Sequence, residues 1–288
     1  MLRTNKIVIG TVQFGLNYGI NNTVGRVLFD EAKEILTTCK NYGINMIDTS
    51  HAYGDSESIL GKIADANFQI ISKYPYLSQS VQTIFHKSLT QLNRDKIYGY
   101  LIHHFDSFKE NLSLWEDMIN LKENNLVEKI GFSIYETEEL EYLFDKDIKF
   151  DLIQFPYNLF DSSFNPYLEE LKKRNIEIHV RSIFLQGLFF KNPNELPRKL
   201  LPMAPYLVEM ASFCKKKNIS IEELALNSVI HNKNIDGVLI GVDNVKQLIK
   251  NINSIWKEIP IEIKSYAESI HMKEKVEIKE LLNPKNWN

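Results

Sequence analysis

Short apolar runs alternate with longer amphipathic segments along the whole chain, and this alternation constrains the fold more than any other feature. Near-continuous apolar runs indicate parallel strands that are covered on both faces. We expect eight strands, at residues 6–11, 45–50, 69–73, 98–103, 128–133, 150–155, 176–182 and 236–241. We expect helices at residues 30–42, 56–65, 78–92, 108–124, 136–144, 163–174, 204–217 with 220–231, and 244–256.

Eight strand–helix units in one chain favour a closed (β/α)8 TIM barrel over an open, doubly wound sheet. No G-x-G-x-x-G follows a predicted strand, so the dinucleotide fingerprint of the open sheet is absent. We therefore predict an α/β fold with one domain over residues 1–288, in which the barrel spans about 5–256. Residues 257–288 form a charged, amphipathic extension, which either packs a helix against the barrel or forms a flap over its site.

The composition excludes several classes of function. The net charge is -3 and basic and acidic residues are interspersed, so the chain offers no electrostatic footprint for nucleic acid. No window reaches the roughly 18 apolar residues of a membrane span, and the first apolar run is too short for a signal peptide. Cys39 and Cys214 form neither a disulfide framework nor a zinc-ligand set. We expect a soluble, cytoplasmic protein; the sequence leaves its oligomeric state open.

Polar residues gather at the predicted strand ends, where barrels carry their function. They are Asp48, His51 and Tyr53 after the second strand, Lys73 at the third, His103 and His104 at the fourth, Ser133 at the fifth, Gln154 at the sixth, and Arg181 with Ser182 at the seventh. Each alone has a structural explanation, such as a loop cap or a packed core residue. Because the second, third and fourth strands are neighbours in a barrel, an aspartate, a tyrosine, a lysine and a histidine converge on one pocket.

This combination of side chains suits the protonation of a carbonyl oxygen. A tyrosine hydroxyl, with a pKa of about 10, is a poor acid at neutral pH. A nearby lysine ammonium favours the phenolate and eases proton donation, and an aspartate keeps that lysine charged. A neutral histidine can donate a hydrogen bond to the carbonyl oxygen and fix its position. No side chain supplies a hydride, so a nicotinamide cofactor is implied.

Eight ordered segments, "IVIGTVQFG", "IDTSHAYGDSESILG", "IISKYP", "YLIHHFD", "IGFS", "IQFPYN", "RSIFLQGLF" and "GVLIGVDNVKQLIKNI", carry a resemblance over about residues 5–256. They resemble the aldo-keto reductases, NAD(P)-dependent oxidoreductases on a (β/α)8 barrel, and the second segment matches the family pattern D-T-[AS]-x-x-Y-G-x-[SG]-E. The resemblance implies a catalytic tetrad of Asp48, Tyr53, Lys73 and His103, with Tyr53 as the general acid. His103 is preferred to His104 because only His103 fits the family pattern L-x-H-x-x-D.

The same matching implies the cofactor-binding residues. They are Gly10 and Thr11 at the nicotinamide, Ser133 and Gln154 at its carboxamide, Arg181 against its ring, Ser182, Leu185 and Gly187 along the pyrophosphate, Gln247 and Asn251 at the adenine, with Gly241 and Lys246 beside them. One departure from the family is Ile134, which follows Ser133 where an asparagine is frequent, so one carboxamide contact is missing.

A second departure concerns the 2′-phosphate of NADP. Asp243 stands where the family frequently has a serine or a basic residue, and its charge would repel a phosphate. Against it stand Lys246, Lys250 and the amides of a helix that begins near Asn244. We therefore expect NADPH to bind more tightly than NADH, by roughly tenfold, with NADH as the alternative cofactor.

The predicted function is the reduction of a small-molecule aldehyde or ketone to an alcohol, with hydride from the nicotinamide and a proton from Tyr53. Phenylalanines in the loops that set specificity suit an apolar surface or a sugar ring, so a sugar or sugar nucleotide is the expected substrate; they are Phe105, Phe108, Phe184, Phe189 and Phe190.

Two alternatives stay open. One is a non-catalytic, NADP-binding regulatory subunit, although all four tetrad positions are filled. The other is a metal-dependent hydrolase with His51, His103, His104 and Asp106 as ligands. Against it, the first strand has no H-x-H, the last strand has no carboxylate, and adjacent strand histidines should point to opposite sides.

Overall fold

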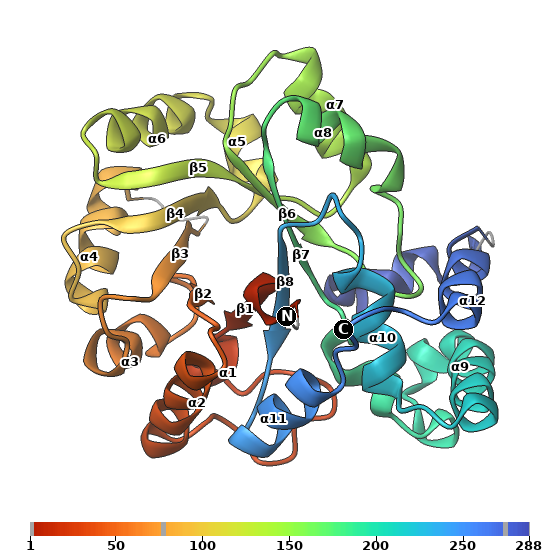
Figure 1. The fold of residues 1–288 in the computed structure, drawn as a ribbon. Coiled ribbons are helices and arrows are strands. Elements are labelled where there is room, and N and C mark those ends of the chain that lie inside the picture. Colours follow the sequence, from red (N-terminus) through yellow and green to blue (C-terminus); the bar gives the residue numbers. More distant parts are fainter. Residues whose placement is uncertain (1–2, 76–78, 273–275, 288) are drawn as a thin grey trace.

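The computed structural model describes residues 3–75, 79–272 and 276–287, and its centre is a closed barrel of parallel strands (Figure 1). The strands are β1 (Ile7–Gly10), β2 (Met46–Asp48), β3 (Gln69–Tyr74), β4 (Ile97–Ile102), β5 (Val127–Ser133), β6 (Leu152–Pro156), β7 (Glu177–Arg181) and β8 (Gly237–Gly241). Each strand pairs with the next along the chain, and β1 pairs with β8 to close the barrel. The predicted (β/α)8 fold is confirmed.

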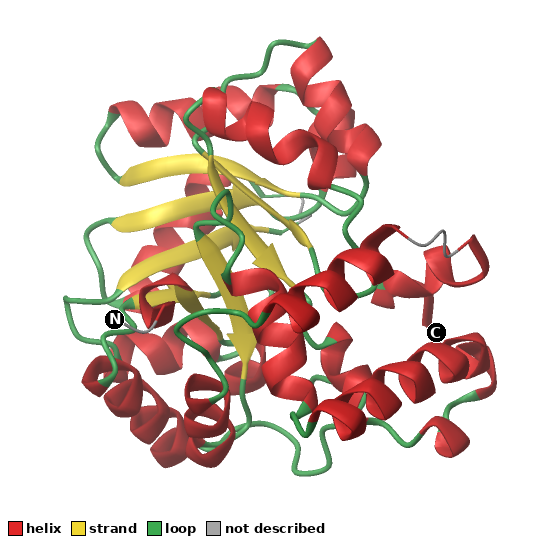
Figure 2. Cartoon of the chain, turned by 45° about the vertical axis from the view of Figure 1, so that its right-hand side comes forward, coloured by secondary structure: helices red, strands yellow, loops and turns green. Residues whose placement is uncertain are grey.

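Helices surround the barrel (Figure 2). They are α1 (Val12–Gly15), α2 (Phe29–Asn41), α3 (Ser56–Ile63), α4 (Val81–Leu92), α5 (Phe105–Glu110), α6 (Ser113–Glu123), α7 (Thr137–Asp145), α8 (Leu168–Lys173), α9 (Ala204–Lys217), α10 (Ile221–Ile230), α11 (Val245–Asn253) and α12 (Ile261–Met272). Short 3-10 segments are η1 (Arg3–Lys6), η2 (Asn165–Tyr167), η3 (Leu185–Phe190), η4 (Pro193–Glu195), η5 (Arg198–Met203), η6 (Val276–Leu282) and η7 (Pro284–Trp287). Within the described ranges, no helix is long and apolar enough to cross a membrane.

Three predicted helices differ from those observed. The helix predicted at 108–124 is two helices, α5 and α6, because Asn111 adopts an extended backbone and its side-chain oxygen accepts hydrogen bonds from Ser113. The helix predicted at 163–174 opens with the 3-10 turn η2, which contains Pro166. Ser78, the first residue of the helix predicted at 78–92, lies outside the described residues.

The barrel interior is filled by apolar side chains. Ile71, Leu101 and Leu152, from β3, β4 and β6, are fully buried and form a cluster separate from the main core under the helices. Side chains alternate along a strand, so the face of β3 that carries Ile71 also carries Lys73. The barrel is therefore a packed core on which the polar residues at the strand ends rest.

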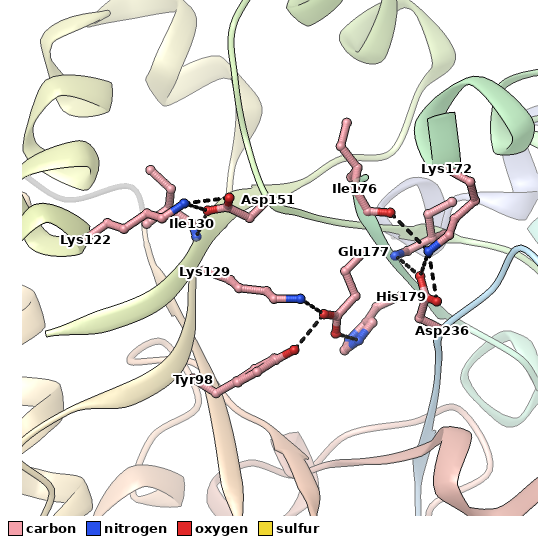
Figure 3. Close-up of polar contacts among 11 residues, drawn as sticks. Tyr98, Lys122, Lys129, Ile130, Asp151, Lys172, Ile176, Glu177, His179 and Asp236 are labelled. Carbon is pink, nitrogen blue, oxygen red and sulfur yellow. Dashed lines mark hydrogen bonds and ion pairs between the residues drawn. The ribbon is translucent and has the colours of Figure 1, made fainter. Parts of the chain in front are cut away.

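A polar network closes the opposite end, where the strands begin (Figure 3). The carboxylate of Glu177 accepts hydrogen bonds from Tyr98 (2.6 Å) and Lys129, and its Oε1 lies 2.6 Å from Nε2 of His179. Burial alone would raise the pKa of Glu177, but the bonds from His179, Lys129 and Tyr98 outweigh it and lower the pKa to about 2. This network joins β4, β5 and β7 across the barrel.

Two aspartates tie neighbouring strands together at the same end (Figure 3). Asp151, just before β6, accepts the backbone N–H of Ile130 in β5 and the ammonium of Lys122 in α6. Asp236, just before β8, makes the same pair of contacts with β7 and with Lys172 of α8. The register of the strands is therefore fixed by these side chains as well as by the backbone hydrogen bonds between the strands.

The C-terminal segment packs a helix against the outside of the barrel, and part of it also borders the cavity. Helix α12 packs against the outer helices, with the ring of Tyr266 stacked on that of Phe213 in α9. Further along, Pro284 lines the cavity at the other end of the barrel. The segment thus covers helices and also contributes to the wall of the site.

We predict that Glu177→Gln removes about 2 kcal/mol from the free energy of unfolding at pH 7, because a depressed folded-state pKa contributes stability above the unfolded pKa. That contribution is lost as the pH falls from 4.5 through about 2. Urea denaturation of both proteins from pH 7 to pH 2 should show the difference shrinking toward zero. Glu170→Gln, which breaks an exposed pair with Arg174, is the control and should cost less than about 0.5 kcal/mol. A pH-independent difference for Glu177→Gln would contradict this account.

Candidate active site

A cavity of about 500 Å³ opens at the end of the barrel where the strands finish, a size typical of small-molecule sites. It is lined by thirteen of the residues predicted from the sequence: Gly10, Thr11, Asp48, Tyr53, His103, Ser133, Gln154, Arg181, Ser182, Gly187, Gly241, Gln247 and Asn251. Three predicted residues do not line it. Lys73 and Leu185 are fully buried, and the side chain of Lys246 is exposed.

The buried ion pair of Asp48 and Lys73 lies beneath the cavity. Nζ of Lys73 is 2.5 Å from Oδ1 of Asp48 and donates a second hydrogen bond to the carbonyl oxygen of Thr49 (2.9 Å). The other carboxylate oxygen accepts Nε2 of Gln154 at 2.9 Å. Burial lowers the pKa of Lys73, and the charge of Asp48 opposes that shift. Both carboxylate oxygens of Asp48 and the ammonium of Lys73 therefore have hydrogen-bond partners, which join β2 and its loop to β3 and β6.

The ring of Tyr53 lies over this pair. Nζ of Lys73 is 5.3 Å from the centroid of the ring, and the ring of His103 meets it edge-on with centroids 5.7 Å apart. Burial raises the pKa of Tyr53 well above its usual value, and the charge of Asp48 raises it further. Burial and the carboxylate therefore set the direction of this shift, which is opposite to the effect expected of a nearby ammonium. The hydroxyl of Tyr53 therefore stays protonated at neutral pH.

The imidazole of His103 is neutral and lies beside the hydroxyl of Ser50. Burial lowers its pKa well below the usual value, and the charge of Lys73 lowers it further. Nδ1 lies 3.0 Å from Oγ of Ser50, and the same Oγ accepts the backbone N–H of Ala52. The Ser50 hydroxyl can donate to Nδ1, and in that tautomer the ring proton lies on Nε2. Ser50 was not among the site residues predicted from the sequence, although it lies in the segment "IDTSHAYGDSESILG" that carries the family resemblance.

The two adjacent histidines do not point to opposite sides. Strand β4 ends at Ile102, so the alternation of a strand no longer applies to His103 and His104, and their rings stack with centroids 4.8 Å apart. His51, another ligand of the metal hypothesis, has Nδ1 3.1 Å from the carboxylate of Glu57. Across the part of the chain that the structure describes, no three His, Cys, Asp or Glu residues are grouped to hold a metal ion.

Arg181 lies in the cavity wall against an aromatic residue that sequence reasoning missed. Its guanidinium carbon is 3.9 Å from the ring centroid of Tyr135, and it donates a hydrogen bond to the carbonyl oxygen of Ile134 (2.9 Å). Nζ of Lys285, in the C-terminal segment, is also 3.9 Å from that centroid. Tyr135 follows β5 by two residues, so its place beside a strand end was the signal that could have found it.

The loop after β7 has an unusual backbone. Ser182, Leu185 and Gln186 have φ values of 64°, 48° and 52°, in the left-handed region that side chains other than glycine rarely adopt. Gly187 follows at 89° without that cost. Strain of this kind persists where the surrounding structure imposes it, and it concentrates at functional sites. The side chain of Leu185 points into the core and anchors the loop rather than lining the cavity.

Other cavity residues were either expected only as part of the specificity loops, as Phe184 and Phe190 were, or were not singled out in the sequence at all. They include Gln13, Tyr18, Phe184, Phe190, Glu222 and Pro284. Burial raises the pKa of Tyr18 to about 12. Glu222 belongs to α10 and Pro284 to the C-terminal segment, so neither stands at the end of a strand.

Comparison with known proteins agrees with this architecture. The model of the Aldo/keto reductase family matches residues 6–271. The L-galactose dehydrogenase of Arabidopsis thaliana is 24% identical over 275 residues, covering 86% of this chain and 84% of that protein. The chloroplastic pyridoxal reductase of the same plant is 23% identical, covering 79% and 73%. Among solved structures, the glycerol dehydrogenase of Gluconobacter oxydans shares the fold with a TM-score of 0.71, 17% identity, and coverage of 94% and 93%.

We predict that Lys73→Met and Asp48→Asn each reduce the free energy of unfolding by about 3 kcal/mol, because each leaves a buried polar partner unpaired. The double variant should lose at least about 2 kcal/mol less than the sum, since it removes both charges. Urea denaturation of the four proteins measures this coupling. Lys149→Met, which breaks an exposed pair with Asp147, is the control for loss of a lysine. Additive losses would show that Lys73 and Asp48 do not stabilise each other.

Proposed function

The chain belongs to the aldo/keto reductase family of oxidoreductases, and we propose that it reduces the carbonyl group of a small molecule to an alcohol with NAD(P)H. The observation that carries the proposal is the cluster at the cavity floor. A protonated Tyr53 and a neutral His103 face the cavity together, and the buried pair of Asp48 and Lys73 lies beneath them. These are the groups needed to hold a carbonyl oxygen and to give it a proton.

The cavity residues fit a dinucleotide. Two buried acceptors among the residues that line it, Oε1 of Gln13 and Oδ1 of Asp243, have no hydrogen-bond partner within the described chain. Unpartnered buried acceptors are costly and indicate a ligand with donor groups. From the resemblance we assign Gly10, Thr11, Ser133 and Arg181 to the nicotinamide end of the cofactor.

Gln154 has two tasks in this proposal. Its Nε2 already donates to Asp48, so its oxygen is left to accept from a carboxamide. Ser182 and Gly187 belong to the strained loop that we assign to the pyrophosphate, with Leu185 as its anchor. Gly241 allows close approach beside Gln13, because a Cβ there would meet Nε2 of Gln13 at 2.3 Å.

In the proposed reaction, a reduced nicotinamide supplies the hydride when it is bound. His103 donates a hydrogen bond from Nε2 to the carbonyl oxygen and fixes its position. Tyr53 gives its proton to that oxygen only as negative charge develops there, since its pKa is raised. As the proton leaves, the ammonium of Lys73 stabilises the phenolate that remains. Asp48 holds Lys73 in place throughout.

We propose a sugar or sugar nucleotide as the substrate. Of the five phenylalanines singled out in the sequence, Phe184 and Phe190 line the cavity, where Tyr18 and Tyr135 join them. Flat aromatic surfaces suit a sugar ring, and the hydroxyls of the tyrosines can bond its hydroxyls. Two of the similar proteins are named for small polyhydroxylated substrates, galactose and glycerol.

We predict that Tyr53→Phe lowers the turnover of a simple aromatic aldehyde by more than roughly 10²-fold, because the proton donor is lost. Cofactor binding should stay within about twofold, since the ring and its contacts with Lys73 and His103 remain. Steady-state kinetics and a fluorescence titration measure the two effects. Tyr42→Phe, on the outer surface, is the matched control. Near-normal turnover in Tyr53→Phe would rule out the assigned acid.

The adjacent histidines give a second test. His103→Ala should lower turnover by roughly 10²-fold, because its hydrogen bond to the carbonyl oxygen is lost. His104→Ala should change turnover by less than about fivefold, because the ring of His104 is stacked on that of His103 but does not line the cavity. Kinetics with the same aldehyde compares them. The reverse order would show that His104 is the residue that contacts substrate.

A further inference from the structure

The cavity end at α10 and α11 carries more negative than positive charge. Glu222 of α10, Asp243 just before α11 and Lys250 of α11 line it, which gives two carboxylates and one ammonium. Lys246, one of the two lysines expected to hold a 2′-phosphate, has an exposed side chain and does not line the cavity. This end is therefore a poor environment for a further anion.

The remaining lysine already has a carboxylate partner. Nζ of Lys250 lies 2.6 Å from Oε1 of Glu222. The side chain of Glu222 is 11% exposed and that of Lys250 is 61% exposed, so the ammonium reaches in from solvent to a carboxylate set in the wall. A phosphate that bonds Lys250 has to share its ammonium with Glu222 and lie beside that carboxylate.

Two of the backbone amides at the start of α11 also have acceptors already. The backbone N–H of Val245 donates to Oε1 of Glu31 at 2.7 Å, and that of Gln247 donates to the side chain of Asn244 at 2.9 Å. The backbone N–H of Asp243 donates to Oε1 of Gln247 at 2.8 Å. A phosphate that used the amides of Val245 or Gln247 would therefore have to replace an acceptor that each already has. Glu31 adds a further negative charge beside the helix start.

Asp243 presents an acceptor that needs a donor. Its Oδ2 accepts a hydrogen bond from Nε2 of Gln247, whereas its Oδ1 is buried and has no partner in the described chain. A ribose hydroxyl can donate to such an oxygen, but an ionised phosphate offers only acceptors and negative charge. Carboxylates that accept from the ribose 2′-hydroxyl are how another dinucleotide-binding fold selects NAD.

We propose that this chain binds NADH in preference to NADPH, and that Asp243 and Glu222 set the preference. The inference rests on the proposed nicotinamide-dependent function and replaces the cofactor choice expected from the sequence. Asp243 accepts a hydrogen bond from a ribose hydroxyl, and Glu222 keeps Lys250 from a 2′-phosphate.

Calorimetric titration of the full chain with NADH and NADPH tests the preference without any turnover. NADH should bind at least tenfold more tightly than NADPH. ADP-ribose should bind more tightly than 2′-phospho-ADP-ribose by a similar factor, because the two dinucleotides differ only at the adenosine end. Raising the salt concentration should narrow the ratio, since repulsion between charges is screened. Equal or tighter binding of NADPH would overturn this inference alone. Absence of binding by both dinucleotides would overturn the proposed function, and the inference with it.

Two variants test the assigned residues. Glu222→Gln should tighten NADPH binding about tenfold by freeing Lys250, with NADH changed by less than twofold. Asp243→Asn should also tighten NADPH binding. It provides an independent test if Glu222→Gln does not fold. Glu170→Gln, on α8, changes the net charge equally and should leave the ratio unchanged. An unchanged ratio in Glu222→Gln or Asp243→Asn, whichever folds, would overturn the assignment.

Discussion

The ion pair between Lys73 and Asp48 sets the arrangement of the candidate site. A charge buried without a partner costs several kcal/mol, so each of these side chains fixes the place of the other inside the barrel. Tyr53 then lies over the ammonium, and His103 meets the tyrosine edge-on. The same pair governs protonation, because Asp48 raises the pKa of Tyr53 and Lys73 lowers that of His103. Geometry and charge at the site therefore have one origin.

The strands, and the proximity of four polar side chains at their ends, could be predicted because their signals are local. Each strand is a short apolar run, and closing such runs into a barrel brings Asp48, Tyr53, Lys73 and His103 together whatever the helices do. Helix ends were predicted less well, since Asn111 can interrupt a helix through its own side chain while the amphipathic pattern continues across it. No periodicity in the sequence records such a competition.

The charges at the cavity end beside α10 and α11 could not be predicted, because they depend on how separate helices pack. Lys250 was visible as a cation, but its partner Glu222 belongs to another helix, and no spacing in the sequence brings the two within 2.6 Å. Glu31 reaches the start of α11 from α2, far away along the chain. The raised pKa of Tyr53 could not be predicted for a related reason, since burial is a property of the packed structure. The order of the strands predicts which side chains meet at the strand ends. The packing of the helices, which decides which of their side chains meet, is not recorded in any local pattern.

The pairing of β1 with β8 has a consequence for how the chain folds. The first and last strands of the barrel must meet, so the closing contacts join residues near opposite ends of the sequence. Contacts between residues so far apart in the sequence form slowly, because the chain between them loses conformational entropy before the contacts contribute any stability. Until then β1 and the most recently placed strand expose unpaired edges. Because β1 has four residues and β2 has three, the edge offered early to another chain is short, which limits intermolecular pairing while the barrel is still open.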